Sequence, residues 1–175
     1  MTLAELHQRI KIERNNYDSL KTFVRRVYAF LCHDRDYYVY RYIRLLRYTE
    51  FFYERKKGQP LAYIPYILLK SKKNKLGQLL NIDMGEGACD TGLYIAHTGV
   101  IVGSASVGKN LKLHGQNCIG SGAVIGDDCE LWVGAMVIGP ARLADGITVA
   151  AGAVVVDDFD EPGIIVGGVP ARRIK

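Results

Sequence analysis

The sequence predicts a mainly β fold, in which a parallel β-helix follows an N-terminal α-helical cap. Three observations predict it: a six-residue repeat in the second half, apolar residues at helical spacing before it, and a change in the sign of the charge. Residues 1–75 carry 17 Lys and Arg against 7 Asp and Glu, whereas residues 76–175 carry 6 against 11. Such a split indicates two units with different surroundings. We therefore expect a helical domain over 1–80 and a β-helix domain with a C-terminal tail over 81–175.

The first domain is predicted from segments whose apolar residues recur at the spacing of one helix face. These segments are 3–12, 18–33 and 36–56, and residues 58–60 (Gly-Gln-Pro) break the pattern. A fourth helix or irregular segment, 61–73, holds Pro65. The segment 36–56 is rich in Tyr and Arg, which allows peripheral contact with a membrane face or a lipid-linked sugar. Packing of these aromatic residues against neighbouring helices and subunits is the interpretation that we favour.

The second domain is predicted from an internal repeat. Written six residues at a time from position 101, ten consecutive blocks open with an aliphatic residue, which neither a helix period nor a strand period would produce. The openers are Ile101, Val107, Leu113, Ile119, Ile125, Leu131, Val137, Leu143, Val149 and Val155. Most blocks also have a small or aliphatic residue four places later, and two weaker blocks extend the pattern back to Cys89.

A six-residue period predicts one short strand and one tight turn in each block. Three blocks then close a triangular coil of eighteen residues, so residues 89–160 should form about four coils. The openers should point inward and stack, with a rise between coils close to the ~4.8 Å spacing of paired strands. Gly, Asn and Asp recur near the corners, where an unusual backbone conformation is least costly for them.

Composition excludes several classes of protein. No apolar run approaches the ~20 residues that span a bilayer, and the first residues lack the apolar segment of a secretory signal. Cys32, Cys89, Cys118 and Cys129 have no metal-ligand spacing, so we expect free thiols, a cytoplasmic protein and no metal. The basic half carries no nucleic-acid-binding motif, and a solvated helical face explains its charge.

Two histidines of the repeat region are candidates for chemistry. His97 and His114 are 17 residues apart, against a coil of 18, so His97 should stack over Gly115 with His114 beside it. Histidine is suited to general-base catalysis near neutral pH. Asp83, fourteen residues before His97, is placed to orient its imidazole. Two surface histidines that meet by chance, and a turn role for Asp83, are the structural alternatives.

Parts of the second domain resemble a known protein family. The hexads, the segment GLYIAHTGVIVG (92–103) and the closing GGVPARRIK (167–175) are similar to hexapeptide-repeat acyltransferases. The branch they resemble is that of serine acetyltransferases and the related O-acetyltransferases of polysaccharide gene clusters. The resemblance implies a left-handed β-helix, a homotrimer, and acetyl-CoA as co-substrate in the groove between two adjacent β-helices. It implies that His97 is the general base, that Asp83 is its acidic partner, and that His114 faces the acceptor.

The resemblance also implies where acetyl-CoA binds. The small residues of WVGA and AAGA match CoA-contacting positions of the family, namely Gly134, Ala135, Gly152 and Ala153. They lie one coil apart in pairs, so a pantetheine arm could run along the edge that they form. Arg172 and Lys175 resemble the basic residues that meet the nucleotide phosphates.

Two departures from the serine acetyltransferases favour a different acceptor. Ala96 stands where those enzymes carry an acidic residue for the substrate ammonium, and no loop with an Arg-His pair interrupts the hexads. A neutral sugar or polysaccharide-precursor hydroxyl is therefore the favoured acceptor, and serine is the alternative. Trp132, one coil above His114, could stack on a sugar ring or on pantetheine, or be plain packing.

Two further functions are compatible with a β-helix of this kind. A non-catalytic β-helix that acts as a scaffold subunit is the alternative of another class. A metal-dependent carbonic anhydrase needs three converging histidines, whereas the repeat region holds two. The sequence thus predicts an O-acetyltransferase.

Overall fold

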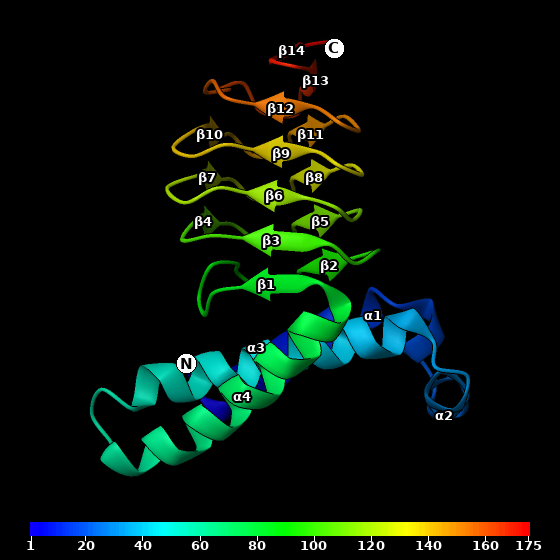
Figure 1. Ribbon diagram of the computed structural model, residues 1–175, viewed down its shortest axis with the longest axis vertical. Coiled ribbons are helices and arrows are strands. Elements are labelled where there is room, and N and C mark those ends of the chain that lie inside the picture. The colour runs from blue at the N-terminus through cyan, green and yellow to red at the C-terminus, as the bar shows by residue number, and fades with distance from the viewer. The chain divides into compact units, whose positions relative to one another are not determined.

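The computed structural model describes residues 1–175, which divide into two compact units, Met1–Leu80 and Asn81–Lys175. Figure 1 labels the elements of both units. Each unit is described by itself. None of the helices has the length and apolarity needed to cross a membrane.

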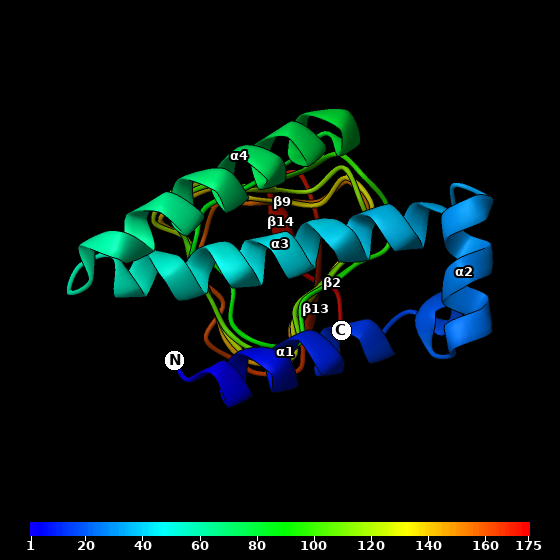
Figure 2. The ribbon, with the colours of Figure 1, turned by 90° about the horizontal axis from the view of Figure 1, so that it is seen from below.

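The first unit is helical. It contains α1 (Leu3–Asn15), η1 (Asp18–Leu20), α2 (Phe23–Leu31), α3 (Arg35–Arg55), η2 (Pro60–Ala62) and α4 (Tyr63–Leu80). The long helix α3 packs against α4 on one side and α1 on the other (Figure 2). The segment expected as one helix over 18–33 is instead η1 followed by α2, because Thr22 accepts a hydrogen bond from the Arg25 amide and begins a new helix there. Pro65 lies in the first turn of α4, where a missing amide proton costs nothing.

The Tyr- and Arg-rich helix α3 faces the interior of this unit with much of its length. Tyr42 and Arg47 are buried. The Arg47 guanidinium contacts Glu13 of α1 at 2.6 Å and Glu50 at 2.9 Å. Burial alone would lower the pKa of Arg47, but the carboxylates of Glu50 and Glu13 outweigh it and raise the pKa above its ordinary value. Internal packing therefore accounts for these residues.

The second unit is a parallel β-solenoid of about five turns, which confirms the fold class. Its strands are β1 (Ile82–Met84), β2 (Tyr94–Ile95), β3 (Val100–Val102), β4 (Ser106–Val107), β5 (Lys112–Leu113), β6 (Cys118–Ile119), β7 (Val124–Ile125), β8 (Glu130–Leu131), β9 (Met136–Val137), β10 (Arg142–Leu143), β11 (Thr148–Val149), β12 (Val154–Val155), β13 (Ile165–Gly168) and β14 (Ala171–Arg173). They form three sheets, ordered β1-β3-β6-β9-β12, β4-β7-β10 and β2-β5-β8-β11-β13. The coils stack like steps in Figure 1, and β14 closes the last one as an antiparallel neighbour of β13.

The solenoid begins one strand earlier than the hexads indicate. Strand β1 pairs in parallel with β3, with Ile82 opposite Val100 and Met84 opposite Val102. The six-residue pattern reaches back only to Cys89, because the segment 85–88 between β1 and Cys89 lacks it. The added strand accounts for the fifth layer of this sheet.

Nine of the ten block openers are buried, and the prediction is wrong for the first. Ile101 is 50% exposed, and its neighbour Val102 is 4% exposed and points inward. The reason lies in the registers: Val102 pairs with Ile119, 17 residues on, whereas Ile95 pairs with Leu113, 18 residues on. The connection that holds His97 is therefore one residue longer than its equivalents above. The next connection, from Val102 to Val107, is one residue shorter, so the phase recovers.

Candidate active site

One corner of the solenoid collects most of the candidate residues. The chain turns there from the sheet of β2 into the sheet of β1, through residues 96–99, 114–117, 132–135 and 150–153 in successive coils. We call these four turns the histidine corner. His97, His114, Trp132, Gly134 and Gly152 all lie on it. The 18-residue coil thus places residues from four separate hexads along one edge.

His97 lies directly against the backbone of the next coil. A Cβ atom added at Gly115 would stand 2.6 Å from the Cβ of His97, closer than two carbon atoms can approach. Gly115 also has φ +108°, which disfavours any side chain. The stacking of His97 over Gly115 that the coil length predicts is therefore seen, and the glycine is required by it. The side chain of His97 is exposed.

His114 belongs to a three-residue cluster with Trp132 and Glu130. Its imidazole stacks on the indole of Trp132, with ring centroids 4.6 Å apart and planes within 4°. Its Nε2 lies 2.6 Å from Oε1 of Glu130. Trp132 is 44% exposed. Such a cluster fixes the imidazole from two sides, by ring stacking and by a short hydrogen bond.

Glu130 is a site residue that the sequence analysis missed. The strand register pairs Lys112 with Glu130, and outward residues alternate along a strand. Glu130 therefore faces outward on the same side of the sheet as Trp132, two residues along the chain, and lies diagonally across from His114 in the neighbouring coil. This alternation is the signal that could have found it. The six-residue repeat does not indicate Glu130, because the outward-facing positions of the repeat are not restricted to one type of residue.

Asn117 is a second missed residue, and it holds the corner together. Its side chain is 1% exposed. Its Oδ1 accepts from the Gly115 amide at 2.8 Å, and its Nδ2 donates to the carbonyls of Trp132 at 2.8 Å and Ala135 at 3.1 Å. Buried amide groups must be hydrogen-bonded to be tolerated. Asn117 therefore ties the turn of His114 to the turn of Trp132.

Asp83 lies on β1, with its backbone opposite Ile101 of β3. Strand β3 is the strand that leaves the His97 turn, and β1 is its neighbour in the sheet, so Asp83 stands close to the start of the histidine corner. Its side chain is exposed. The carboxylate of Glu130 contacts the other histidine of the corner, His114. The pairing of Asp83 with His97 stays a prediction.

The predicted CoA positions lie on the edge of the histidine corner, in the coils that follow His97 toward the C-terminus. The two glycines leave that edge without side chains. Gly134 donates its amide to the Gly115 carbonyl at 3.0 Å, and a Cβ at Gly134 would lie 3.8 Å from the backbone of Gly152. Ala135 and Ala153 are fully buried, so their methyl groups line the core and offer no side chain to a ligand. The edge open to a ligand is therefore the backbone of Gly134 and Gly152.

The two basic candidates lie at the end of the chain. Arg172 is on β14, and its guanidinium contacts the Asp157 carboxylate at 2.7 Å, both groups being exposed. An exposed pair of this kind contributes little and can exchange partners. The Lys175 side chain is exposed, and its backbone pairs with Ile165. Their role in binding phosphate stays a prediction.

Comparison with known proteins points to one group of enzymes. No family model matches the chain. Serine acetyltransferase of Mycobacterium tuberculosis (strain ATCC 25618 / H37Rv) is 35% identical over 107 residues, which are 55% of this chain and 46% of that protein. The resemblance to the serine acetyltransferase-like branch is confirmed. This chain spans about half the length of that relative.

Solved structures of serine acetyltransferases share the fold along nearly the whole chain. The enzyme from Neisseria gonorrhoeae has a TM-score of 0.69 at 21% identity, over 98% of this chain and 68% of its own. The soybean enzyme complexed with serine has a TM-score of 0.70 at 22% identity, over 98% and 70%. A serine acetyltransferase in complex with CoA has a TM-score of 0.69 at 17% identity, over 98% and 71%. These likenesses show the fold, including the helical region before the β-helix.

Proposed function

We propose that this protein is an acetyl-CoA-dependent O-acetyltransferase. The observation that carries the proposal is the continuous contact along the histidine corner. His97 rests on Gly115, Gly115 bonds to Gly134, and Gly134 lies against Gly152. A base and a bare edge for a narrow thioester arm thus lie on one line. Proximity of this kind is what acyl transfer between two substrates requires.

The proposed reaction uses His97 as general base. Its imidazole takes the proton of the acceptor hydroxyl while the oxygen attacks the carbonyl carbon of the thioester. The tetrahedral intermediate collapses with cleavage of the carbon–sulfur bond, and the leaving thiolate takes the proton from the imidazolium. The acetyl ester and free CoA are the products. Asp83 is proposed to orient the imidazole and to stabilise its charged form.

His114 is proposed to bind the acceptor rather than to take its proton. With neutral His114 donating Nε2–H to Glu130, its Nδ1 is an acceptor with a fixed direction. The stack on Trp132 prevents the ring from rotating away. A donor group of the acceptor other than the reacting hydroxyl would hydrogen-bond to Nδ1, which leaves the proton of the reacting hydroxyl for His97. Glu130 acts through His114 and is a positioning residue in this scheme.

Serine is the acceptor that the comparisons support, through the Mycobacterium tuberculosis relative and the soybean enzyme complexed with serine. A neutral sugar hydroxyl is the second candidate, and two observations favour it. Ala96 offers no charge to an ammonium group. The 18-residue registers from Lys112 to Glu130 and from Glu130 to Thr148 leave no room for an inserted loop. A panel of acceptors decides between the two.

Acetyl-CoA is proposed to bind along Gly134 and Gly152, with Arg172 and Lys175 near the nucleotide phosphates. The resemblance further suggests a homotrimer in which an adjacent β-helix forms the other wall. The CoA complex of a protein with this fold supports the choice of co-substrate. Sedimentation of the purified protein measures whether three copies assemble.

The test is a direct assay with L-serine, other amino acids and nucleotide sugars as acceptors. Product should be followed by mass spectrometry of the acetylated acceptor, because the exposed thiol of Cys32 would react with the dyes that detect free CoA. An acetyl ester on one acceptor class supports the proposal and names the substrate. Acetyl-CoA that neither binds nor turns over would favour the non-catalytic scaffold.

A further inference from the structure

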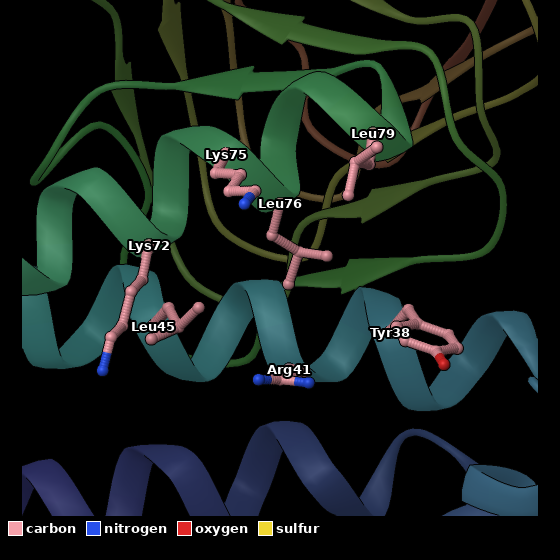
Figure 3. Close-up of a pocket in the computed structure, with 7 residues that line it drawn as sticks. All are labelled: Tyr38, Arg41, Leu45, Lys72, Lys75, Leu76 and Leu79. Atoms are coloured by element: carbon pink, nitrogen blue, oxygen red, sulfur yellow. The ribbon is translucent and has the colours of Figure 1, made fainter.

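The helical unit contains a pocket of about 340 Å³ between α3 and α4. Tyr38, Arg41 and Leu45 extend from α3, and Lys72, Lys75, Leu76 and Leu79 extend from α4 (Figure 3). On α3 the spacings are 3 and 4 residues, and on α4 both Lys75 and the adjacent Leu76 lie 3 or 4 residues from Lys72 and Leu79, so each helix contributes a single face. We call this feature the α3–α4 groove. It lies wholly within the first unit.

Three of the lining residues are cations without a carboxylate partner. Arg41, Lys72 and Lys75 make no ion pair, and their side chains are exposed at the rim. No Asp or Glu lines the groove. Three positive charges around one pocket repel each other and attract an anion.

The acidic residues of the two helices do not neutralise this charge. Helix α4 has no Asp or Glu over its whole length. Those of α3 are engaged elsewhere: Glu50 contacts Arg47, Glu54 contacts the N-terminal amine, and Asp36 contacts Arg35. The excess charge at the groove is therefore built into the sequence.

The floor of the groove is apolar. Leu45 and Leu76 are half-buried between the helices, and Leu79 extends the same surface along α4. Tyr38 closes one end, with its hydroxyl 2.8 Å from His33. A simple anion would neutralise the cations but would leave the apolar floor exposed to water. A ligand with an aliphatic part would cover the leucines as well.

We propose that the α3–α4 groove binds an amphiphile with a phosphate head and an aliphatic tail. The head lies between Arg41, Lys72 and Lys75, where a guanidinium can hold two phosphate oxygens at once. The tail lies along Leu45, Leu76 and Leu79. The shared chemistry fits both a free alkyl phosphate and the head of a phospholipid. This binding is independent of the acetyl transfer proposed for the β-helix.

The test uses the full chain and octyl phosphate below its critical micelle concentration, followed by calorimetry and by backbone amide NMR shifts. Saturable binding with shifts confined to α3 and α4 is expected. Octanol and inorganic phosphate, which each present half of the ligand, should bind at least tenfold more weakly. Vesicles of phosphatidylcholine with and without phosphatidic acid tell whether a membrane lipid serves as well as the free molecule.

Matched variants locate the site. R41Q together with K75Q removes two charges at the rim. It should weaken the binding of octyl phosphate by about tenfold or more, because the free energy of a hydrogen bond to a charged group corresponds to at least that change in affinity. R44Q removes an exposed charge from the same helix outside the groove and should leave the affinity unchanged. Both variants change exposed residues, so folding should survive, which circular dichroism checks.

Three results would overturn the proposal. One is the absence of saturable octyl phosphate binding. Another is a loss of binding free energy in R44Q that equals, for each charge removed, the loss in R41Q/K75Q, which would mean that net charge alone attracts the anion. The third is a change in sedimentation coefficient in the R41Q/K75Q variant with unaltered octyl phosphate affinity, which would make the groove an interface between copies. All three are independent of acetyltransferase activity.

Discussion

The Nε2 atom of His114 lies 2.6 Å from Oε1 of Glu130, across two neighbouring coils of the β-helix. Because a carboxylate can only accept, this pair sets which ring nitrogen of a neutral His114 carries the proton. In the neutral imidazole the proton sits on Nε2, and Nδ1 is left as an acceptor for the substrate.

Replacement of Glu130 should alter the tautomer of His114. In E130A the Nε2 proton loses its acceptor, and ¹⁵N NMR of the imidazole should show a mixture of tautomers where the parent shows Nε2–H alone. The acceptor KM should rise by about tenfold, with a smaller fall in kcat. E130Q keeps a carbonyl oxygen in place and should recover most of the affinity. An unchanged ¹⁵N spectrum in E130A would rule out this role.

Gly115→Ala should disturb the position of His97. The new methyl group would stand 2.6 Å from the Cβ of His97 at a φ of +108°, and the backbone strain alone costs about 1–3 kcal/mol. Gly163→Ala is the matched control, because Gly163 has φ +73° and no atom within 4 Å of the added Cβ. Both variants should melt at a lower temperature, but only G115A should lose most of its turnover. Equal turnover in the two variants would refute the close contact.

Asn117→Ala should destabilise the β-helix. It leaves the Gly115 amide and the carbonyls of Trp132 and Ala135 without their partner in a buried place. Each unsatisfied buried group costs roughly 1–3 kcal/mol, so the free energy of unfolding should fall by a few kcal/mol. Urea unfolding measures the loss. Asn110→Ala, at an exposed corner, is the comparison and should cost less; equal losses would contradict the bracing role of Asn117.

The cysteines should differ sharply in reactivity. Burial raises the pKa of the Cys129 thiol, so at pH 8 it stays protonated where an exposed thiol begins to ionise. Because the thiolate is the nucleophile, iodoacetamide should label exposed Cys32 first. Cys129 should react only on unfolding. Peptide mass spectrometry gives the order, and early labelling of Cys129 would contradict the burial of its coil.

The solenoid could be predicted from the sequence because its core repeats aliphatic residues at one period. Each coil buries these residues against those of the next coil, so the same pattern recurs throughout. The error at Ile101 arose because one extra residue near His97 and one fewer after Val102 cancel within a coil, which leaves the count of six almost intact. Glu130 and Asn117 could not be predicted for another reason. Their roles depend on contacts between coils, and single outward or buried polar residues have no periodic signature.

The candidate site was predictable only in part. The 18-residue coil placed His97 over Gly115 and Trp132 over His114, and both stacks are present. The same spacing grouped Ala135 and Ala153 with the glycines, although their methyl groups point into the core. Spacing gives the row on which a residue lies. Whether it faces inward or outward depends on the local turn.

The most direct test of the account is the turnover of His97→Ala. If His97 takes the acceptor proton, this variant should bind acetyl-CoA as the parent does, and its kcat should fall by roughly 100-fold to 10,000-fold. Asp83→Asn should cost less, and His114→Ala should mainly raise the acceptor KM. A His97→Ala variant with near-parental kcat, or a His114→Ala variant that loses more kcat than it, would contradict the assignment of His97 as the base.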